Sequence, residues 1–223
     1  MWAPNLFMPE KRDKTKPVLK AYLDESGIHD NAKVCVVAGY FGGINAWNKF
    51  EREWKEVLAV AGIDEFHAQR FFTRDGNKRV RPYKDWDDKR ADGFLQNLLR
   101  VISENKIHPF GASVVLSEWK TLSLDEKRWM TGGEYDEKSK RFKTTGAPSK
   151  CYFLPFQCDV VLTARYCHAG VQMDFVFDEN KELKGYANNL YELLKRMPLA
   201  VQGKLGKISF ESSRKLCNCK LRI

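Results

Sequence analysis

Two strand-like segments near the start of the chain are joined by a link that constrains the fold more than any other feature. Residues 18–24 (VLKAYLD) and 33–41 (KVCVVAGYF) are rich in apolar and β-branched side chains, and the link between them reads SGIHDNA. Parallel neighbours need a crossover of about a dozen residues or more, so the two strands are expected to pair antiparallel. Any fold assigned to the chain must contain this hairpin.

The periodicity of the remaining sequence mixes helices with strands. Apolar residues at three- and four-residue steps predict amphipathic helices over residues 45–61, 85–105, 152–167 and 183–197. Strands are predicted over residues 108–116, 171–177 and 207–210. The segment VQMDFVF at 171–177 has the strictest alternation of apolar and polar positions. The expected fold class is therefore α/β, a mixed sheet flanked by helices.

The length of 223 residues favours one domain with elaborations over two independent domains. Residues 1–16 end in the charged run KRDKTK and are expected to form a lead-in, followed by a single domain over residues 17–223. Residues 123–149 are charged, contain glycine and lack a clear period, which predicts an irregular insertion.

The charge balance indicates a polyanionic partner. Lys and Arg number 38 against 29 Asp and Glu, a net charge of +9, and nucleic acid is the commonest ligand of such chains. A merely well-solvated surface is the alternative. No apolar run reaches the ~18 residues of a membrane span, and the start MWAPNLFMPEKRDKTK lacks the layout of a signal peptide, so the cytoplasm is the expected compartment.

The cysteine spacing indicates neither a zinc finger nor a disulfide framework. The six cysteines, at positions 35, 151, 158, 167, 217 and 219, include no C-x-x-C pair. Cys35 lies in an apolar run and is expected in the core. Cys217 and Cys219 are either a redox or metal pair or two incidental thiols.

Two of the predicted strands end in the dipeptide Asp-Glu. Asp24 and Glu25 close the first strand, and Asp178 and Glu179 close the alternating one. Ligands gather beyond strand ends in α/β sheets, so carboxylates that emerge there from neighbouring strands can bind one divalent cation. The alternative is that these acids start turns and cap helices, as Asp178 could do for the helix that follows it.

A basic, aromatic segment, HAQRFFTRDGNKRVRPYK, lies between the first two predicted helices. Arg and Lys neutralise phosphates, and Phe and Tyr stack on unpaired bases, so this segment is expected to bind the nucleic acid. The predicted phosphate-binding residues are Arg70, Arg74, Lys78, Arg79 and Arg81. The alternative is an ordinary solvated loop anchored in the core by Phe71 and Phe72.

Four short motifs, AYLDESG, EFHA, FDEN and ISFESS, follow one another in an order that resembles the bacterial and phage domain-of-unknown-function family "thirty-eight hundred". The resemblance spans residues 20–214 and implies a ribonuclease-H-like fold with a metal site built on a first-strand aspartate. It places Asp24 on that aspartate and Glu25 on the neighbouring acid. It places His67 on the family histidine, and Asp178 and Glu179 on the later acidic pair.

The sequence departs from that family after FESSRK, where members continue into a helix with an L-Q-x-A-D signature that supplies the last acidic ligand. Here the sequence reads LCNCKLRI instead. We therefore expect the C-terminal helix and one metal ligand to be missing, with Mg²⁺ or Mn²⁺ weakly bound and little activity.

The function expected from these features is metal-dependent hydrolysis of phosphodiester bonds, with DNA and RNA both open as substrates. A non-catalytic nucleic-acid-binding or regulatory protein on the same fold is the alternative. The short link after Asp24 disfavours the parallel sheet of PIN-like nucleases. The segment GGINAWNK lacks the Gly-Lys-Ser/Thr of a P-loop, which disfavours that class of nucleotide-binding enzyme.

Overall fold

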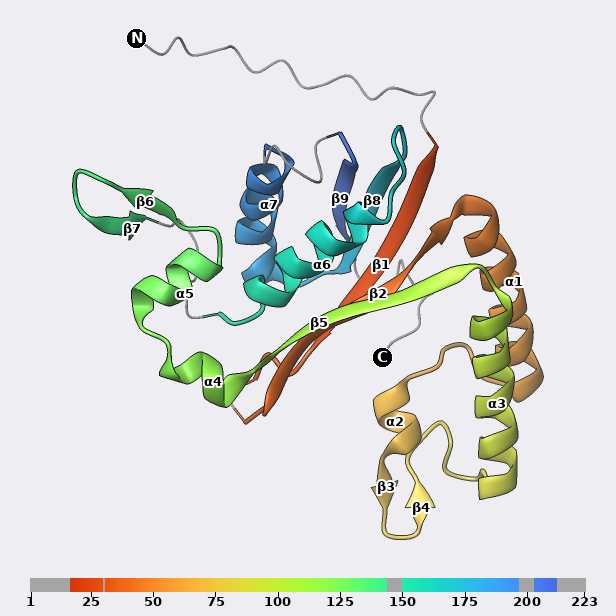
Figure 1. Ribbon diagram of the computed structural model, residues 1–223. Coiled ribbons are helices and arrows are strands. Elements are labelled where there is room, and N and C mark those ends of the chain that lie inside the picture. The colour runs from red at the N-terminus through yellow and green to blue at the C-terminus, as the bar shows by residue number, and fades with distance from the viewer. Residues whose placement is uncertain (1–16, 30, 144–149, 197–202, 212–223) are drawn as a thin grey trace.

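A five-stranded mixed sheet forms the centre of the protein (Figure 1). The computed structural model describes residues 17–29, 31–143, 150–196 and 203–211. The strands of the sheet, in spatial order, are β5 (Ile107–Val115), β2 (Val34–Gly43), β1 (Val18–Ser26), β8 (Gln172–Asp178) and β9 (Leu205–Glu211). β2 is antiparallel to both β1 and β5, whereas β1, β8 and β9 are mutually parallel. The antiparallel hairpin predicted from the sequence is confirmed, and β1 lies at the centre of the sheet beside β8.

The turn after β1 depends on a glycine. Gly27 has a φ of 74°, in the left-handed region that side chains disfavour. A Cβ atom at this position would lie 1.9 Å from the carbonyl oxygen of Val34, so even alanine would collide with β2. The Gly in the D-E-S-G motif therefore lets the chain fold back within a short link and sets the antiparallel register.

Helices cover both faces of the sheet. The described helices are α1 (Ile44–Ala61), α2 (Ala68–Phe72), α3 (Asp88–Glu104), α4 (Leu116–Thr121), α5 (Leu124–Met130), α6 (Phe153–Arg165) and α7 (Lys181–Lys195). α6 and α7 pack on one face, and α1 and α3 form a hairpin on the other (Figure 1). Within the described part of the chain, none of these helices combines the length and apolar character needed to cross a membrane.

The apolar side chains divide into two cores, because alternate residues of β1 point to opposite faces. Ala21 and Leu23 pack against α6 and α7, whereas Tyr22 meets Trp47 of α1 at a ring-centroid distance of 4.7 Å. The Trp47 indole N–H also donates a hydrogen bond of 2.9 Å to the Lys20 carbonyl, which fixes α1 to the sheet. Burying a large apolar side chain contributes roughly 1.5–3 kcal/mol, so each core anchors its helices firmly.

Two segments are more regular than the sequence indicates. The basic, aromatic segment contains α2 and a small hairpin of β3 (Arg74–Asp75) and β4 (Lys78–Arg79). The expected irregular insertion at 123–149 contains α5, which begins with a Ser123–Glu126 capping box, and a second hairpin of β6 (Glu134–Asp136) and β7 (Arg141–Lys143). Short polar elements carry little hydrophobic periodicity, so the sequence pattern does not show them. Residues 144–149 lie outside the described residues.

Candidate functional site

Asp24 and Asp178 lie side by side at the ends of two neighbouring parallel strands. Leu23 of β1 is the register partner of Phe177 of β8, so the next residue on each strand is one of the two aspartates. Adjacent strands lie about 4.8 Å apart, and residues in register point to the same face. The side chains of Asp24 and Asp178 therefore share the face that carries α1.

The two aspartates are held in the same way. The Asp24 Oδ1 atom accepts a hydrogen bond of 2.9 Å from the backbone N–H of Glu25. The Asp178 Oδ1 atom accepts an equivalent bond of 3.0 Å from the backbone N–H of Glu179. Asp178 does not cap α7, because the side chain of Asn180 accepts the hydrogen bond from Glu182 at the start of that helix. The carboxylate of Asp178 is thus not used as a helix cap.

A third acid, Glu211, extends the row. Glu211 is the register partner of Asp178 on β9, and its Oε1 atom accepts a hydrogen bond of 3.4 Å from Ser209. Asp24, Asp178 and Glu211 therefore occupy matching positions on three consecutive parallel strands. The sequence analysis missed Glu211, although the motif ISFESS ends a short strand in an acid just as the two D-E motifs do.

Glu25 points to the other face of β1, where it lies partly buried and accepts a hydrogen bond of 3.2 Å from Asn180. Burial raises the pKa of the Glu25 carboxyl, the Asn180 hydrogen bond opposes the shift, and the negative charges of Asp24 and Asp178 raise it further. The influence of both aspartates places Glu25 within electrostatic reach of the same site. A carboxyl with a raised pKa is suited to holding or moving a proton.

Glu179, the acid after Asp178, has a different environment. Its side chain is exposed and lies 3.6 Å from the ammonium group of Lys184 on α7. A solvated acid that pairs with a lysine one helix turn away is a weak metal ligand. The structure therefore gives the two members of each D-E motif separate surroundings.

His67, the predicted site histidine, is buried at the start of α2 with 8% of its surface exposed. Its Nε2 atom lies 2.5 Å from Glu65 Oε1, and its backbone N–H donates to the Tyr83 hydroxyl at 3.2 Å. These contacts tie His67 to the aromatic core around α2. Within the described residues, the structure does not bring it into a three-ligand cluster with the two aspartates.

The donor set at the strand ends fits a loosely held Mg²⁺ or Mn²⁺ ion. No group of three or more His, Cys, Asp or Glu side chains in the described ranges is arranged as a complete metal centre. Mg²⁺, however, usually keeps several waters and is bound through one or two carboxylates together with substrate phosphates. A pair such as Asp24 and Asp178 meets that requirement and would hold the ion weakly without substrate.

A basic pocket lies beyond the ends of β1 and β8, on the side of the sheet that carries α6 and α7. It has a volume of about 410 Å³ and is bounded by Gly27 and Ile28, which follow β1, and by Asn180, which follows β8. Three lysines also line it, Lys120, Lys127 and Lys150. The sequence analysis did not single out these lysines, because they are far apart in sequence and only α4, α5 and the start of α6 bring them together.

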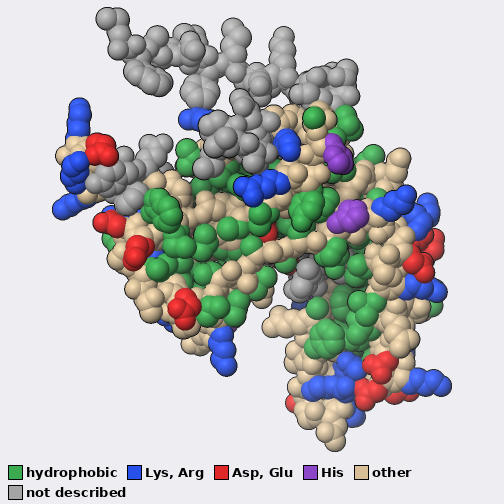
Figure 2. Space-filling model, viewed as in Figure 1, with side chains coloured by type: hydrophobic (Ala, Val, Ile, Leu, Met, Phe, Trp, Pro, Cys, Tyr) green, Lys and Arg blue, Asp and Glu red, His purple; other side chains and the backbone are tan. Residues whose placement is uncertain are grey.

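The predicted phosphate-binding residues divide into two groups. Arg70, Arg74, Lys78 and Arg81 are exposed, and Figure 2 shows Lys and Arg side chains gathered at the lower end of the molecule, over β3, β4 and the start of α3. Arg79 is only 6% exposed and donates a hydrogen bond of 2.8 Å to the Phe71 carbonyl. Its guanidinium lies 4.8 Å from the centre of the Phe71 ring. Arg79 therefore supports the fold of this segment.

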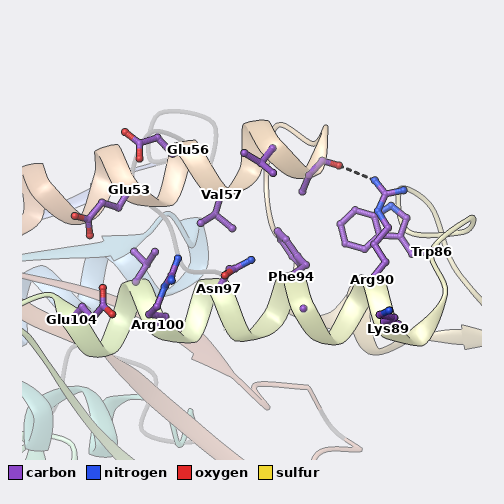
Figure 3. Close-up of a pocket in the computed structure, with 14 residues that line it drawn as sticks. Glu53, Glu56, Val57, Trp86, Lys89, Arg90, Phe94, Asn97, Arg100 and Glu104 are labelled. Atoms are coloured by element: carbon purple, nitrogen blue, oxygen red, sulfur yellow. Dashed lines mark hydrogen bonds between the residues drawn. The ribbon is translucent and has the colours of Figure 1, made fainter.

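A larger groove of about 760 Å³ runs between α1 and α3 (Figure 3). Arg90 lies 4.4 Å from the centre of the Trp86 ring and donates a hydrogen bond of 3.1 Å to the Ala61 carbonyl. The charges along the groove are mixed, with Glu53 and Glu56 on α1, and Lys89, Arg90, Arg100 and Glu104 on α3. This alternation is typical of a solvated helix pair and gives no convergent chemical group.

Comparisons of the chain with family models, with curated proteins and with solved structures found no match. The function is therefore inferred from the geometry of the site itself.

Proposed function

We propose that the protein is a divalent-metal-dependent nuclease with a ribonuclease-H-like fold, centred on Asp24 and Asp178. The observation that carries the proposal is the placement of these two aspartates on one face, in register, at the ends of adjacent parallel strands. The antiparallel first hairpin and the mixed, helix-flanked sheet agree with the fold that the family resemblance implies. The net charge of +9 and the basic pocket beyond the ends of β1 and β8 support an anionic substrate.

Each part of the site has a chemical role in this proposal. Asp24 and Asp178 hold the cation, with Glu211 beside them to accept hydrogen bonds from its water shell. Once bound, the metal activates water and stabilises negative charge on the phosphate oxygens. Glu25, with its raised pKa, retains or transfers a proton next to the aspartates. The lysines of the basic pocket, on the α6 and α7 side of the same strand ends, attract the anionic substrate.

Metal binding and cleavage test the proposal together. The purified protein is incubated with fluorescent single-stranded DNA and RNA in Mn²⁺ or Mg²⁺, and Mn²⁺ binding is measured separately by electron paramagnetic resonance. Asp24→Asn and Asp178→Asn keep the shape of the side chain and remove its charge, so each should weaken Mn²⁺ binding and abolish cleavage. Asp92→Asn, on the exposed side of α3, is the matched control and should change neither.

A non-catalytic nucleic-acid-binding protein is the second candidate. It is favoured by the absence of a complete three-ligand group among the described residues, together with the positive net charge. Salt-dependent binding of nucleic acid without Mn²⁺ affinity or cleavage would establish this candidate and overturn the first.

A further inference from the structure

A separate cleft lies between the edge strand β5 and helix α6. It has a volume of about 560 Å³. Phe41 and residues 108–111 line it from the sheet, and Asp159, Thr163 and Tyr166 line it from α6 and its C-terminal end. The view in Figure 2 shows hydrophobic side chains at the surface along β5 and α6. The proposed nuclease site does not include this cleft or its polar groups.

The base of the cleft carries two buried polar groups without partners. Asp159 and Thr163 are each only 1% exposed and lie one helical turn apart. The carboxylate of Asp159 accepts a hydrogen bond from the backbone N–H of Ala112, but its Oδ2 atom has no partner, and neither has Thr163 Oγ1. Buried polar atoms in native proteins are nearly always satisfied by protein, water or a ligand. Two such atoms, on residues one helical turn apart that line one cleft, indicate a binding site for a donor.

Aromatic rings form the walls of the cleft. Phe41 lies 5.2 Å from His108 and 5.8 Å from Phe110, measured between ring centroids. Tyr166 stacks against Phe41 at 6.0 Å and remains 70% exposed, an unusual position for a large ring. Among the described residues, no Lys or Arg lines the cleft, although the chain carries 38 of them. A carboxylate beside aromatic rings, in a lining that includes His108 but no described Lys or Arg, favours a cation.

We propose that this cleft binds the primary ammonium group of an alkylamine. The ammonium donates hydrogen bonds to Asp159 Oδ2 and Thr163 Oγ1, and its methylene groups pack against Phe41 and Tyr166. A quaternary ammonium has no N–H to donate and would leave both oxygens unsatisfied. A nucleotide would bring a phosphate towards a carboxylate without a neutralising cation. The amine can come from a free di- or polyamine or from a lysine side chain of another protein, since both present the same group.

The proposal has a defined pH dependence. Burial raises the pKa of Asp159 to about 7, and the hydrogen bond from Ala112 limits the shift. Alkylammonium groups remain charged up to about pH 10, so affinity follows the ionised fraction of Asp159 and should fall roughly 30-fold between pH 8 and pH 5.5. His108 and Tyr166 also line the cleft. Burial raises the pKa of two further titratable groups near Asp159, Cys158 and Tyr152, so both stay neutral in this range.

Ligand-observed and protein-observed NMR test the proposal on the full chain. The probes are n-butylammonium, 1,4-diaminobutane and Nα-acetyl-lysine amide, with n-butanol and tetramethylammonium as matched controls. At pH 8 the three primary amines should bind and shift the Ala112 amide resonance, and the controls should bind at least tenfold more weakly. Tighter binding of 1,4-diaminobutane would identify a free amine as the source, and tighter binding of the lysine derivative would identify a protein side chain.

Two variants distinguish binding at this site from nonspecific binding. Asp159→Asn keeps the shape and the Ala112 contact, and it should reduce amine binding more than tenfold and remove its pH dependence. Tyr166→Ala alters only an exposed wall and should weaken binding severalfold without unfolding the protein. The proposal is wrong if n-butanol or a nucleoside binds the cleft better than n-butylammonium, or if Asp159→Asn binds the amines as the parent chain does. Failure of all probes to bind at millimolar concentration would also overturn it.

Discussion

Replacing Arg79 by methionine should destabilise the protein without greatly changing its affinity for nucleic acid. The methionine keeps an apolar stem of similar length but leaves the Phe71 carbonyl without the hydrogen bond that Arg79 donates at 2.8 Å. An unsatisfied buried acceptor costs about 1–3 kcal/mol, and loss of the contact with the Phe71 ring costs about 0.5–2 kcal/mol. The ion pair with the exposed Asp88 adds little, because solvent screens it.

The expected loss is therefore about 2–4 kcal/mol, which corresponds to a fall in Tm of about 5–15 °C for a chain of this size. Urea unfolding followed by circular dichroism measures the free energy, and fluorescence anisotropy with labelled single-stranded DNA and RNA measures the affinity. Arg81→Met removes the same charge from an exposed position and is the control; it should weaken binding and leave stability unchanged. An Arg79→Met variant as stable as the parent but as weak in binding as Arg81→Met would refute the structural role.

Three further predictions follow from the structure. Gly27→Ala should destabilise the protein by more than the ~1–2 kcal/mol of a left-handed residue, because its Cβ also meets the Val34 carbonyl; a thermal melt within 1 °C of the parent would contradict this. Burial raises the pKa of Glu25, so the ionised carboxylate lowers the free energy of unfolding at neutral pH. This destabilisation disappears as the pH falls through the raised pKa and the carboxyl becomes protonated. Glu25→Gln should accordingly raise Tm at pH 7.5, with a smaller gain at pH 4.5, and an equal gain at both values would argue against the shift. Affinity for single-stranded nucleic acid should fall steeply as salt is added. Joint neutralisation of the exposed basic residues Arg70, Lys78 and Arg81 should make this salt dependence weaker. An affinity that does not change with salt would show that the charge serves solubility alone.

The sheet could be predicted from the sequence because its signals are local and strong. Residues 18–24 and 33–41 are apolar runs around a short link, and the strand at 171–177 alternates almost without exception. The observed β1, β2 and β8 lie over these segments, and the pairing of β1 with β2 follows from link length alone. The ends of α1 and α3 also agree with their signals, since Gly62 terminates α1 in the left-handed conformation and Asp87 caps α3.

The candidate site could be predicted only in part. Asp24 and Asp178 each follow a clear strand, so their meeting depended only on the two strands being neighbours. Glu211 directly follows the predicted strand at 207–210 and could have been found in the same way, whereas the three lysines of the basic pocket come from elements with weak periodicity and could not. Arg79 was expected among the phosphate-binding residues, but it is buried. Its burial depends on how α2 and β4 pack together, which the local sequence pattern does not indicate. Residues 212–223, with Cys217 and Cys219, lie outside the described residues, so expectations about them stay predictions.

The central claim is that Asp24 and Asp178 together hold one divalent cation. Mn²⁺ titration by electron paramagnetic resonance tests it most directly, with the parent chain, Asp24→Asn, Asp178→Asn and the double variant measured side by side. The account predicts one weak site in the parent chain that each single variant removes, so that the double variant is no worse than either single one. Mn²⁺ binding that survives in the double variant, or two losses that add independently, would contradict a shared site at the ends of β1 and β8.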